Sequence, residues 1–282
     1  MPTRIGILHP GEMGSAVAAT ASNSGNDIYW CASGRSQASI SRAEALGLNA
    51  MKSLQELCDT CDILFSVCPP HAAMDVANAV IDCRFQGIYA DFNAVSPRTV
   101  KAIGTRLEKA GIAFVDGGII GLPPARPGTT WLYLSGHEAE KVAACFSAGP
   151  LETAILGEEP GQASGLKMCF AANSKGTAAM HTAILGAAEA MGVRSALEKQ
   201  WDIYNPGFTE KSHGRIRQVA RKAWRFTGEM EEIAQTLADN GMPPEFHQGA
   251  ADIYSRQEAF KDTATEPTIE EILEVVSKPA SK

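Results

Sequence analysis

Short apolar runs and longer amphipathic stretches alternate along the first half of the chain. The apolar runs lie at residues 4–8, 28–32, 63–68, 88–92, 113–116 and 131–134. Between most of them, at 13–24, 36–46, 72–81 and 96–110, apolar residues recur with the spacing of a helix. Strands that are apolar almost throughout and alternate with helices are typical of a parallel sheet covered on both faces. The pattern therefore predicts an α/β fold with a Rossmann-type doubly wound parallel sheet.

The strand pattern ends at a turn over residues 157–161 (GEEPG). Residues 163–191 fit one long helix, because apolar side chains recur there at helical steps. Shorter helices are predicted at 195–201, 211–225, 229–240, 244–256 and 268–276. A length of 282 residues, at roughly 150 per domain, also allows two domains. We therefore expect the α/β domain at residues 1–160 and an all-helical domain at residues 161–282.

A glycine-rich turn joins the first predicted strand to the first helix, over residues 5–14 (IGILHPGEMG). A dinucleotide site needs a tight turn, a backbone that can approach a pyrophosphate, and close packing of helix on strand. Gly11 and Gly14 can fill the last two roles, whereas His9 stands where the first glycine usually lies. The place of the turn favours dinucleotide binding over an ordinary turn in which the glycines only allow packing. The candidate cofactor contacts here are His9, Pro10, Gly11, Glu12, Met13 and Gly14.

The residues after the second strand indicate which dinucleotide binds. An NAD site usually has a carboxylate about 20 residues beyond the glycines, for the ribose hydroxyls. No carboxylate lies between Asp27 and Glu44, whereas Arg35 and Ser36 offer a guanidinium and a hydroxyl. These donors suit a 2′-phosphate, so the sequence favours NADP over NAD. The alternative is that Arg35 is an ordinary solvated surface residue.

Composition excludes several other classes of protein. Apolar residues make up 45% of the chain and charged residues 20%, as in a globular protein with a core. The 25 Lys and Arg against 32 Asp and Glu give a net charge of −7, which disfavours nucleic acid as a partner. No apolar run reaches the length of a membrane span, and no signal peptide is apparent. Seven scattered cysteines predict reduced thiols in a cytoplasmic protein, and no histidine or cysteine spacing predicts a metal site.

These motifs resemble the β-hydroxyacid dehydrogenase and 6-phosphogluconate dehydrogenase superfamily, over most of the chain. Residues 11–14 (GEMG) are similar to its cofactor turn. Residues 66–69 (SVCP) lie where its fourth strand meets the nicotinamide, and 93–97 (NAVSP) resemble the segment after its fifth strand. The resemblance implies further cofactor contacts at Val67, Cys68, Pro69 and Asn93, and Ser33, which directly follows the second predicted strand, is a further candidate.

The rest of the chain extends the resemblance. Residues 116–128 look like a divergent copy of the superfamily's substrate loop, and 161–167 (GQASGLK) resemble the start of its interdomain helix. Segments 223–233, 241–244 and 249–251 resemble a poorly characterised branch of NAD(P)-binding oxidoreductases with a helical C-terminal domain. The resemblance implies a small-molecule substrate and a homodimer formed largely by the helical domain.

The resemblance also makes Lys167 the candidate catalytic residue, because the family's interdomain helix carries a catalytic lysine. A positioned amine can give a proton to the alkoxide formed by hydride transfer, or take one in reverse. The alternative is a lysine whose ammonium reaches water from a surface helix. On a regular helix, Ala171 and Ser174 share the face of Lys167.

Two departures from the family pattern bear on the substrate. Ala171 replaces the family's asparagine, and Ile120 stands where the loop's serine would be. Because neither can pair with a carboxylate, we expect a bulkier, less polar carbonyl or imine to be preferred over small hydroxy acids. The candidate substrate contacts are Gly118, Ile119, Ile120, Phe170 and Ser174. An imine reductase and a non-catalytic NADP(H) sensor remain the alternative functions.

Overall fold

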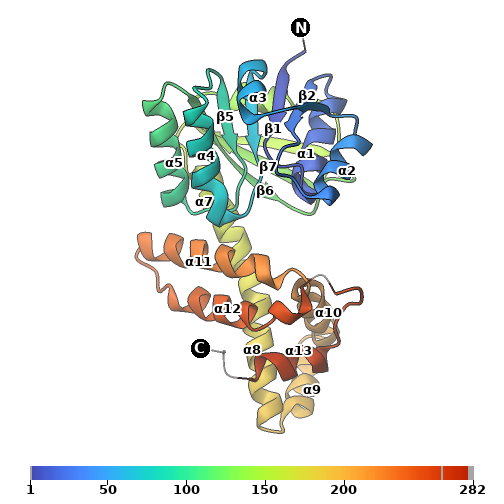
Figure 1. Cartoon of the computed structure of the whole chain (residues 1–282). Helices are drawn as coiled ribbons and strands as arrows, with labels where there is room; N and C mark the ends of the chain where they lie inside the picture. Colours follow the sequence, from blue (N-terminus) through green and yellow to red (C-terminus); the bar gives the residue numbers. More distant parts are fainter. Residues whose placement is uncertain (1, 262, 279–282) are drawn as a thin grey trace. The chain divides into compact units, whose positions relative to one another are not determined.

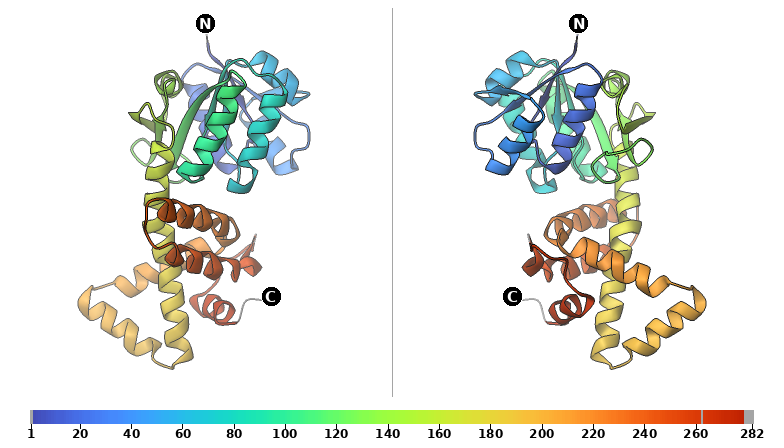
Figure 2. Two further views of the ribbon diagram at one scale, coloured as in Figure 1. Left: turned by 90° about the vertical axis from the view of Figure 1, so that its left-hand side faces the viewer. Right: turned by 90° about the vertical axis from the view of Figure 1, so that its right-hand side faces the viewer.

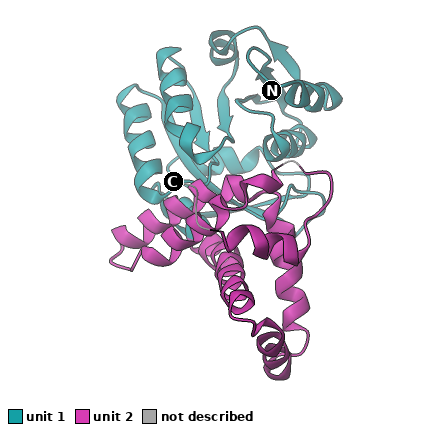
Figure 3. Ribbon diagram, turned by 60° about the horizontal axis from the view of Figure 1, so that its bottom comes forward, with its two compact units in different colours: residues 1–168 teal, residues 169–282 magenta. Residues whose placement is uncertain are grey.

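The computed structural model describes residues 2–261 and 263–278. The chain forms two compact units, Met1–Met168 and Cys169–Lys282, shown in teal and magenta in Figure 3. The change from one unit to the other falls within helix α7 (Gln162–Ala171). This helix begins just after residue 160, where we predict the domain boundary.

The first unit contains one eight-stranded sheet in the order β3-β2-β1-β4-β5-β6-β7-β8 (Figure 1). Strands β1 to β6 are parallel, β7 is antiparallel to β6, and β8 is parallel to β7. The strands are β1 (Arg4–Ile7), β2 (Asp27–Cys31), β3 (Asn49–Met51), β4 (Ile63–Ser66), β5 (Ile88–Asp91), β6 (Ala113–Ile120), β7 (Thr130–Ser135) and β8 (Leu151–Gly157). The predicted Rossmann-type sheet is confirmed, with the correction that its last two strands run in reverse.

Helices cover both faces of this sheet (Figure 2). Alternation along each strand produces two separate apolar clusters. On β4, for example, Phe65 joins the cluster with α1, α2 and α6, whereas Leu64 joins the cluster with α3, α4 and α5. These helices are α1 (Glu12–Asn23), α2 (Gln37–Ala45), α3 (Leu54–Thr60), α4 (Ala73–Asp82), α5 (Pro97–Lys109) and α6 (Ala139–Ala144).

The register places the candidate cofactor loops at one edge of the sheet. Ile7 of β1 pairs with Phe65 of β4, and Ser66 of β4 pairs with Asp91 of β5. Asp91 in turn pairs with Asp116, after which β6 continues to Ile120. The carboxyl ends of β1, β4 and β5 are therefore nearly level, and the end of β6 extends beyond them. In open α/β sheets, ligands bind at this carboxyl edge.

The second unit is all-helical over its described residues, as predicted. Its helices are α8 (Thr177–Ala190), α9 (Arg194–Tyr204), α10 (Phe208–Ala220), α11 (Ala223–Asp239), α12 (Glu245–Ser255) and α13 (Ile269–Val276). Leu185, Ile216 and Ile272 pack together in an apolar cluster that joins α8, α10 and α13. The helix predicted at 211–225 is wrong in its extent, because the chain leaves the helical path between α10 and α11.

The long helix predicted at 163–191 is interrupted by a π-helical segment at Ala172–Gly176, between α7 and α8. The Tyr254 hydroxyl donates to the Lys175 carbonyl oxygen (2.7 Å), and the Lys175 ammonium pairs with the buried Glu229 carboxylate. The same ammonium lies 4.4 Å from the centre of the Phe226 ring. These contacts hold the wide turn in place. The helical spacing that puts Ser174 on the face of Lys167 therefore does not apply beyond Ala171.

The described helices include none that is both long and apolar enough to cross a membrane.

Phe65 should be a major source of stability in the first unit. Its ring is fully buried and lies 5.0 Å from the ring centre of Phe92 and 5.3 Å from that of Phe146. We expect Phe65→Ala to lower the free energy of unfolding by about 3–5 kcal/mol in urea titrations. Leu122→Ala is the control, because Leu122 is 65% exposed, and it should change the value by less than about 0.5 kcal/mol. Similar losses in both variants would contradict this account of the core.

Candidate functional site

The turn after β1 has the two glycine features that a dinucleotide needs. A Cβ atom on residue 14 would overlap the His9 carbonyl oxygen, so α1 packs this close to the turn only because residue 14 is glycine. A Cβ atom on Gly11 would meet no protein atom within 4 Å. Gly14 therefore allows the helix to pack, and Gly11 leaves the backbone open to a ligand. Pro10 lies in the same turn, and Glu12 and Met13 begin α1 directly after it.

Two basic side chains at this edge contain buried nitrogen atoms that lack partners. His9 Nδ1 and Arg35 Nε are buried and make no hydrogen bond in the described part of the chain. Burial, followed by the nearby positive charge of Arg35, lowers the pKa of His9 to about 4. Burial also lowers the pKa of Arg35. An anionic ligand would supply the acceptors that both groups lack, so these residues fit a phosphate-bearing cofactor.

The two serines near Arg35 differ in their surroundings. The Ser36 hydroxyl caps α2 by accepting a hydrogen bond from the Ser39 backbone N–H (3.3 Å), a role that the structure of the helix explains. Ser33 is exposed in the loop that follows β2. Both leave the sheet at the same edge as Arg35.

Asn93 joins the ends of β4 and β5. Its Oδ1 accepts from the Cys68 backbone N–H (2.5 Å), and its Nδ2 donates to Ser66 Oγ (3.0 Å) and Asp91 Oδ2 (3.0 Å). Burial raises the pKa of Asp91 to about 7. Asn93 is itself buried, so its side chain holds the 66–69 loop, including Val67 and Pro69, at the carboxyl edge.

The carboxylate of Asp116 caps helix α7. Its Oδ2 accepts from the backbone N–H groups of Gly161 (2.8 Å) and Ser164 (3.1 Å) and from Ser135 Oγ (3.0 Å), and its Oδ1 accepts from Ser164 Oγ (2.6 Å). Ser135 Oγ also accepts from the Ala163 backbone N–H (3.2 Å). Burial raises the pKa of Asp116, and the four donors act in the opposite direction. Three helix N–H groups that have no partner within the helix are thus satisfied by β6 and β7.

This cap places Lys167 against the end of β6. A Cβ atom on residue 118 would lie 2.6 Å from the Ala163 carbonyl oxygen and 3.0 Å from Lys167 Cβ. Gly118 is thus required for α7 to approach the strand. It lies two residues beyond the Asp91–Asp116 pair, at the same level as Asn93. Lys167, which is partly exposed, therefore lies at the edge where the candidate cofactor loops end.

The predicted substrate residues fall into three groups. Gly118 and Ile120 lie on one face of β6, the face that α7 approaches at Gly118. Ile119 points the other way and packs in the apolar core, which argues against a substrate contact. Phe170 and Ser174 belong to the second unit, on α7 and the π-helical segment.

The residues that support Lys167 carry no motif that local sequence patterns reveal. The resemblance places Asp116 at the start of the substrate loop and predicts no role for Ser135 or Ser164. A signal is nevertheless present, because Asp116 and Ser135 are polar residues at the ends of otherwise apolar strands. Such buried polar groups need hydrogen-bond partners, and here the partner is the start of a helix.

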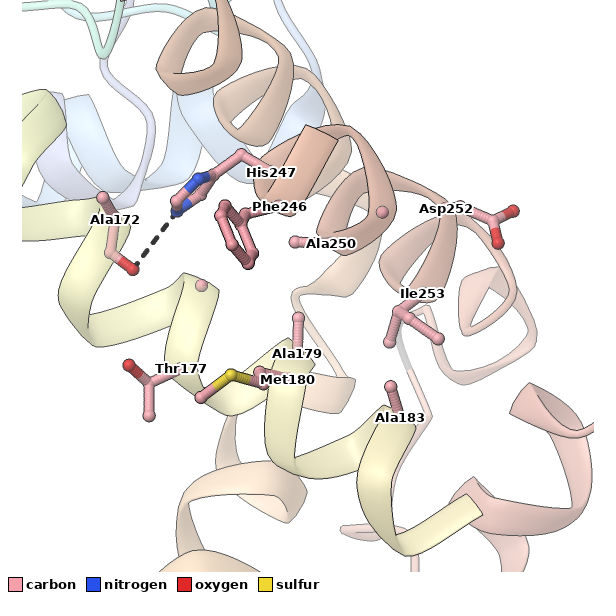
Figure 4. Close-up of a pocket in the computed structure, with 12 residues that line it drawn as sticks. Ala172, Thr177, Ala179, Met180, Ala183, Phe246, His247, Ala250, Asp252 and Ile253 are labelled. Carbon is pink, nitrogen blue, oxygen red and sulfur yellow. Dashed lines mark hydrogen bonds between the residues drawn. The ribbon is translucent and has the colours of Figure 1, made fainter. Parts of the chain in front are cut away.

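The second unit contains a cavity of about 510 Å³ between the π-helical segment, α8 and α12 (Figure 4). Ala172, Gly176 and Ala183 make room for it, and Phe246 lies on the opposite wall. His247 Nε2 faces the Ala172 carbonyl oxygen at 3.5 Å. Elsewhere, residues 2–261 and 263–278 bring together no three His, Cys, Asp or Glu side chains that could hold a metal ion.

Residues 4–148 match the family described as the NAD binding domain of 6-phosphogluconate dehydrogenase. The chain belongs to this family. Residues 188–257 match a second family, a domain of unknown function (DUF1932). An uncharacterized 28.5 kDa protein of Methanothermus fervidus is 30% identical over 243 residues, which are 86% of this chain and 93% of that protein. The predicted resemblance is confirmed, and the family implies a dinucleotide cofactor that the turn fits.

Solved structures show how widely the fold is shared. A conserved protein of unknown function, described as similar to 3-hydroxyacid dehydrogenases, is 26% identical, with a TM-score of 0.66 over 91% of this chain and 98% of that one. The 3-hydroxyisobutyrate dehydrogenase of Mycobacterium tuberculosis has a TM-score of 0.71 at 18% identity, over 99% and 100% of the chains. An imine reductase from Myxococcus stipitatus has a TM-score of 0.58 at 19% identity, over 99% and 100%. Dehydrogenases and imine reductases therefore share this fold.

Replacing Asp116 with asparagine tests the cap. An amide oxygen cannot accept all four hydrogen bonds, and the amide N–H₂ group would face backbone donors. Each buried donor left unpaired costs about 1–3 kcal/mol, so Asp116→Asn should lower the free energy of unfolding by about 2–4 kcal/mol in urea. Asp27→Asn, at an exposed position that begins β2, is the control. If Asp116→Asn were no more destabilising than this control, the carboxylate would not be holding α7.

Proposed function

We propose that this protein is an NADP(H)-dependent oxidoreductase that transfers a hydride between the nicotinamide and a small alcohol or carbonyl compound, with Lys167 as general acid and base. The observation that carries the proposal is the position of Lys167. The Asp116 cap and the absence of a side chain at Gly118 hold it at the carboxyl edge of the sheet. The loops of a dinucleotide-binding family end at the same edge.

The chemistry needs one proton-transferring group near the reacting oxygen. The reduced nicotinamide, when bound, supplies the hydride. The Lys167 ammonium would then protonate the oxygen as charge develops on it, and the neutral amine would remove the hydroxyl proton in the reverse direction. Because Lys167 is anchored on a capped helix, its backbone is already in position before proton transfer. This pre-positioning lowers the entropic part of the activation barrier.

NADP is the proposed cofactor because the residues after β2 are basic and not acidic. Arg35 Nε is buried without a hydrogen-bond partner, and burial lowers the pKa of Arg35. An anionic ligand beside the guanidinium would satisfy this nitrogen and stabilise the charge. The region between Asp27 and Glu44 has no carboxylate for ribose hydroxyls. A 2′-phosphate would pair with Arg35, whereas NAD offers no such group.

The proposed substrate is a carbonyl compound that is less polar than a small hydroxy acid. Ile120 lies on the β6 face that α7 approaches, where it offers an apolar surface and no donor to a carboxylate. A buried carboxylate without partners is costly, so acids should bind poorly. The same apolar surface would suit a C=N compound, and imine reductases share the fold, which makes imine reduction the second candidate.

Turnover should depend on Lys167. With NADPH and a panel that pairs 3-hydroxyisobutyrate and its oxidised form with matched uncharged ketones and imines, we expect the uncharged compounds to react best. Lys167→Met should lower kcat by about 10²–10⁴-fold, because that is the usual contribution of a general acid or base. Its affinity for NADPH should stay within a few-fold of wild type. Lys109→Met, at an exposed position at the end of α5, is the control.

Other outcomes of these assays would contradict the proposed role of Lys167, the proposed catalysis or the proposed substrate. Near wild-type kcat in Lys167→Met would remove this residue from the mechanism. NADPH binding without turnover of any compound in the panel would favour a sensor. A clear preference for the small hydroxy acid would show that the Ile120 face does not select the substrate.

We also propose that the second unit forms a homodimer. Exposed apolar side chains gather on α8 and α12, where Met180 is 51% exposed and Phe246 75%, and Met191, directly after α8, is 68% exposed. Ile184 is also exposed on α8. Exposed apolar patches of this kind are typical of association surfaces. A second copy of the chain would bury both helices through a two-fold axis.

Sedimentation velocity should show a dimer at micromolar concentration. Phe246→Glu and Met180→Glu should shift the protein towards monomer, because a charge would be buried in the interface. Leu122→Glu, an exposed position in the first unit, should leave the dimer intact. A wild-type monomer at these concentrations would refute the proposal.

A further inference from the structure

The departure at residue 9 lies in the cofactor turn itself. Dinucleotide-binding turns usually have glycine at this position, because it makes the turn tight. Here the backbone still forms the turn, and the Gly11 N–H donates to the His9 carbonyl oxygen (2.9 Å). The chain thus tolerates a large side chain at a place where the family fold needs none. An imidazole next to the dinucleotide is therefore an addition to the site.

The sheet brings this imidazole close to Arg35. Strands β1 and β2 are neighbours, with Ile7 paired to Trp30, and His9 and Arg35 follow the ends of these two strands. His9 is close enough for the guanidinium charge to affect its protonation. Both His9 Nδ1 and Arg35 Nε are buried and lack partners in the described part of the molecule. Two basic side chains thus lie close together at the edge of the sheet, and each has one ring or guanidinium nitrogen that could still hydrogen-bond to a ligand.

Among the described residues, no carboxylate contributes to the pKa shift of His9 or of Arg35. Cys31 of β2 and Cys68 of the loop after β4 lie near Arg35, and burial raises the pKa of Cys68 to about 12. From α1, Glu12 lies exposed in the first turn of the helix. Only burial and Arg35 shift the pKa of His9, and both lower it. A dianion placed between the two groups would reverse this balance.

We propose that His9 and Arg35 together bind the 2′-phosphate of NADP, and that His9 enters this contact as a protonated imidazole. The proposal rests on the proposed cofactor and adds a second residue that selects it. The imidazole is neutral in the free protein at pH 7.5. Binding of the phosphate then takes a proton from solution, because the dianion favours the imidazolium. NAD, without the phosphate, should bind with no such uptake.

The pH dependence follows from this difference. A group whose pKa is higher in the complex than in the free protein makes binding tighter as the pH falls through the pKa of the complex. NADP affinity should therefore rise as the pH is lowered from 8 to about 6.5. The measurement stays above the region near pH 6 where a phosphate itself takes up a proton.

The direct test is proton uptake measured by isothermal titration calorimetry. NADP⁺ and NAD⁺ are each titrated into the full-length protein at pH 7.5, in two buffers with different heats of ionisation. For wild type we expect net proton uptake with NADP⁺ and none with NAD⁺. His9→Gly restores the glycine of an ordinary turn, and it should abolish the uptake and weaken NADP⁺ by about 10- to 100-fold, the usual range for a charge-assisted hydrogen bond. NAD⁺ affinity should change by no more than a few-fold.

Two further variants serve as controls. His9→Gln keeps most of the side-chain volume but cannot become charged, so it too should lose proton uptake even if the glycine variant folds poorly. His137→Gln replaces a histidine in the first unit whose side chain is 79% exposed, and it should behave as wild type. Arg35→Ala should weaken NADP⁺ and leave NAD⁺ nearly unchanged.

The possible results separate this inference from the proposed cofactor. Equal weakening of NADP⁺ and NAD⁺ in His9→Gly would place the imidazole on the shared pyrophosphate and overturn the inference. Wild-type NADP⁺ binding without proton uptake, or with unchanged affinity in both His9 variants, would overturn it while the NADP assignment stands. Tighter binding of NAD⁺ than of NADP⁺ by wild type, or no binding of either, would overturn both.

Discussion

The buried carboxylate of Asp116 holds the candidate site together. A carboxylate removed from water is costly unless donors surround it, and here the start of α7 and two serine hydroxyls supply them. The same contacts attach the helix to the ends of β6 and β7. Once α7 is fixed there, its close approach at Gly118 and the position of Lys167 follow.

At the carboxyl edge of the sheet, acidic side chains are buried and basic side chains are partly exposed. The side chains of Asp91 and Asp116 are fully buried, and their carboxylate oxygens accept hydrogen bonds from groups of the protein itself. The basic groups His9, Arg35 and Lys167 lie nearer the surface, where a ligand can reach them. In the proposed function, a phosphate-bearing cofactor would therefore meet basic groups, whereas the buried acids hold the loops in place. This arrangement suits binding by preformed groups, which lowers the entropic cost of association.

Much of the first unit could be predicted, because its central strands are buried on both faces and their apolar runs are therefore unmistakable. Strands β3 and β8 were not predicted. Each lies at an edge of the sheet, and β8 keeps exposed side chains such as Ile155 and Leu156. The π-helical segment was missed for a different reason. Its supports, Tyr254 and Glu229, are 79 and 54 residues away from Lys175, so no local pattern reveals them.

The sequence by itself determined the α/β class, the glycine turn with its unusual histidine, and the helical character of the second half, because each depends on neighbouring residues and short periods. The family resemblance added Lys167. Only the tertiary structure decided that Asp116 caps α7 through residues 45 and 48 positions away, and that Ile119 turns into the core while Gly118 admits the helix. Those outcomes depend on which distant segments pack together, and such contacts produce no periodic pattern of residues in the sequence.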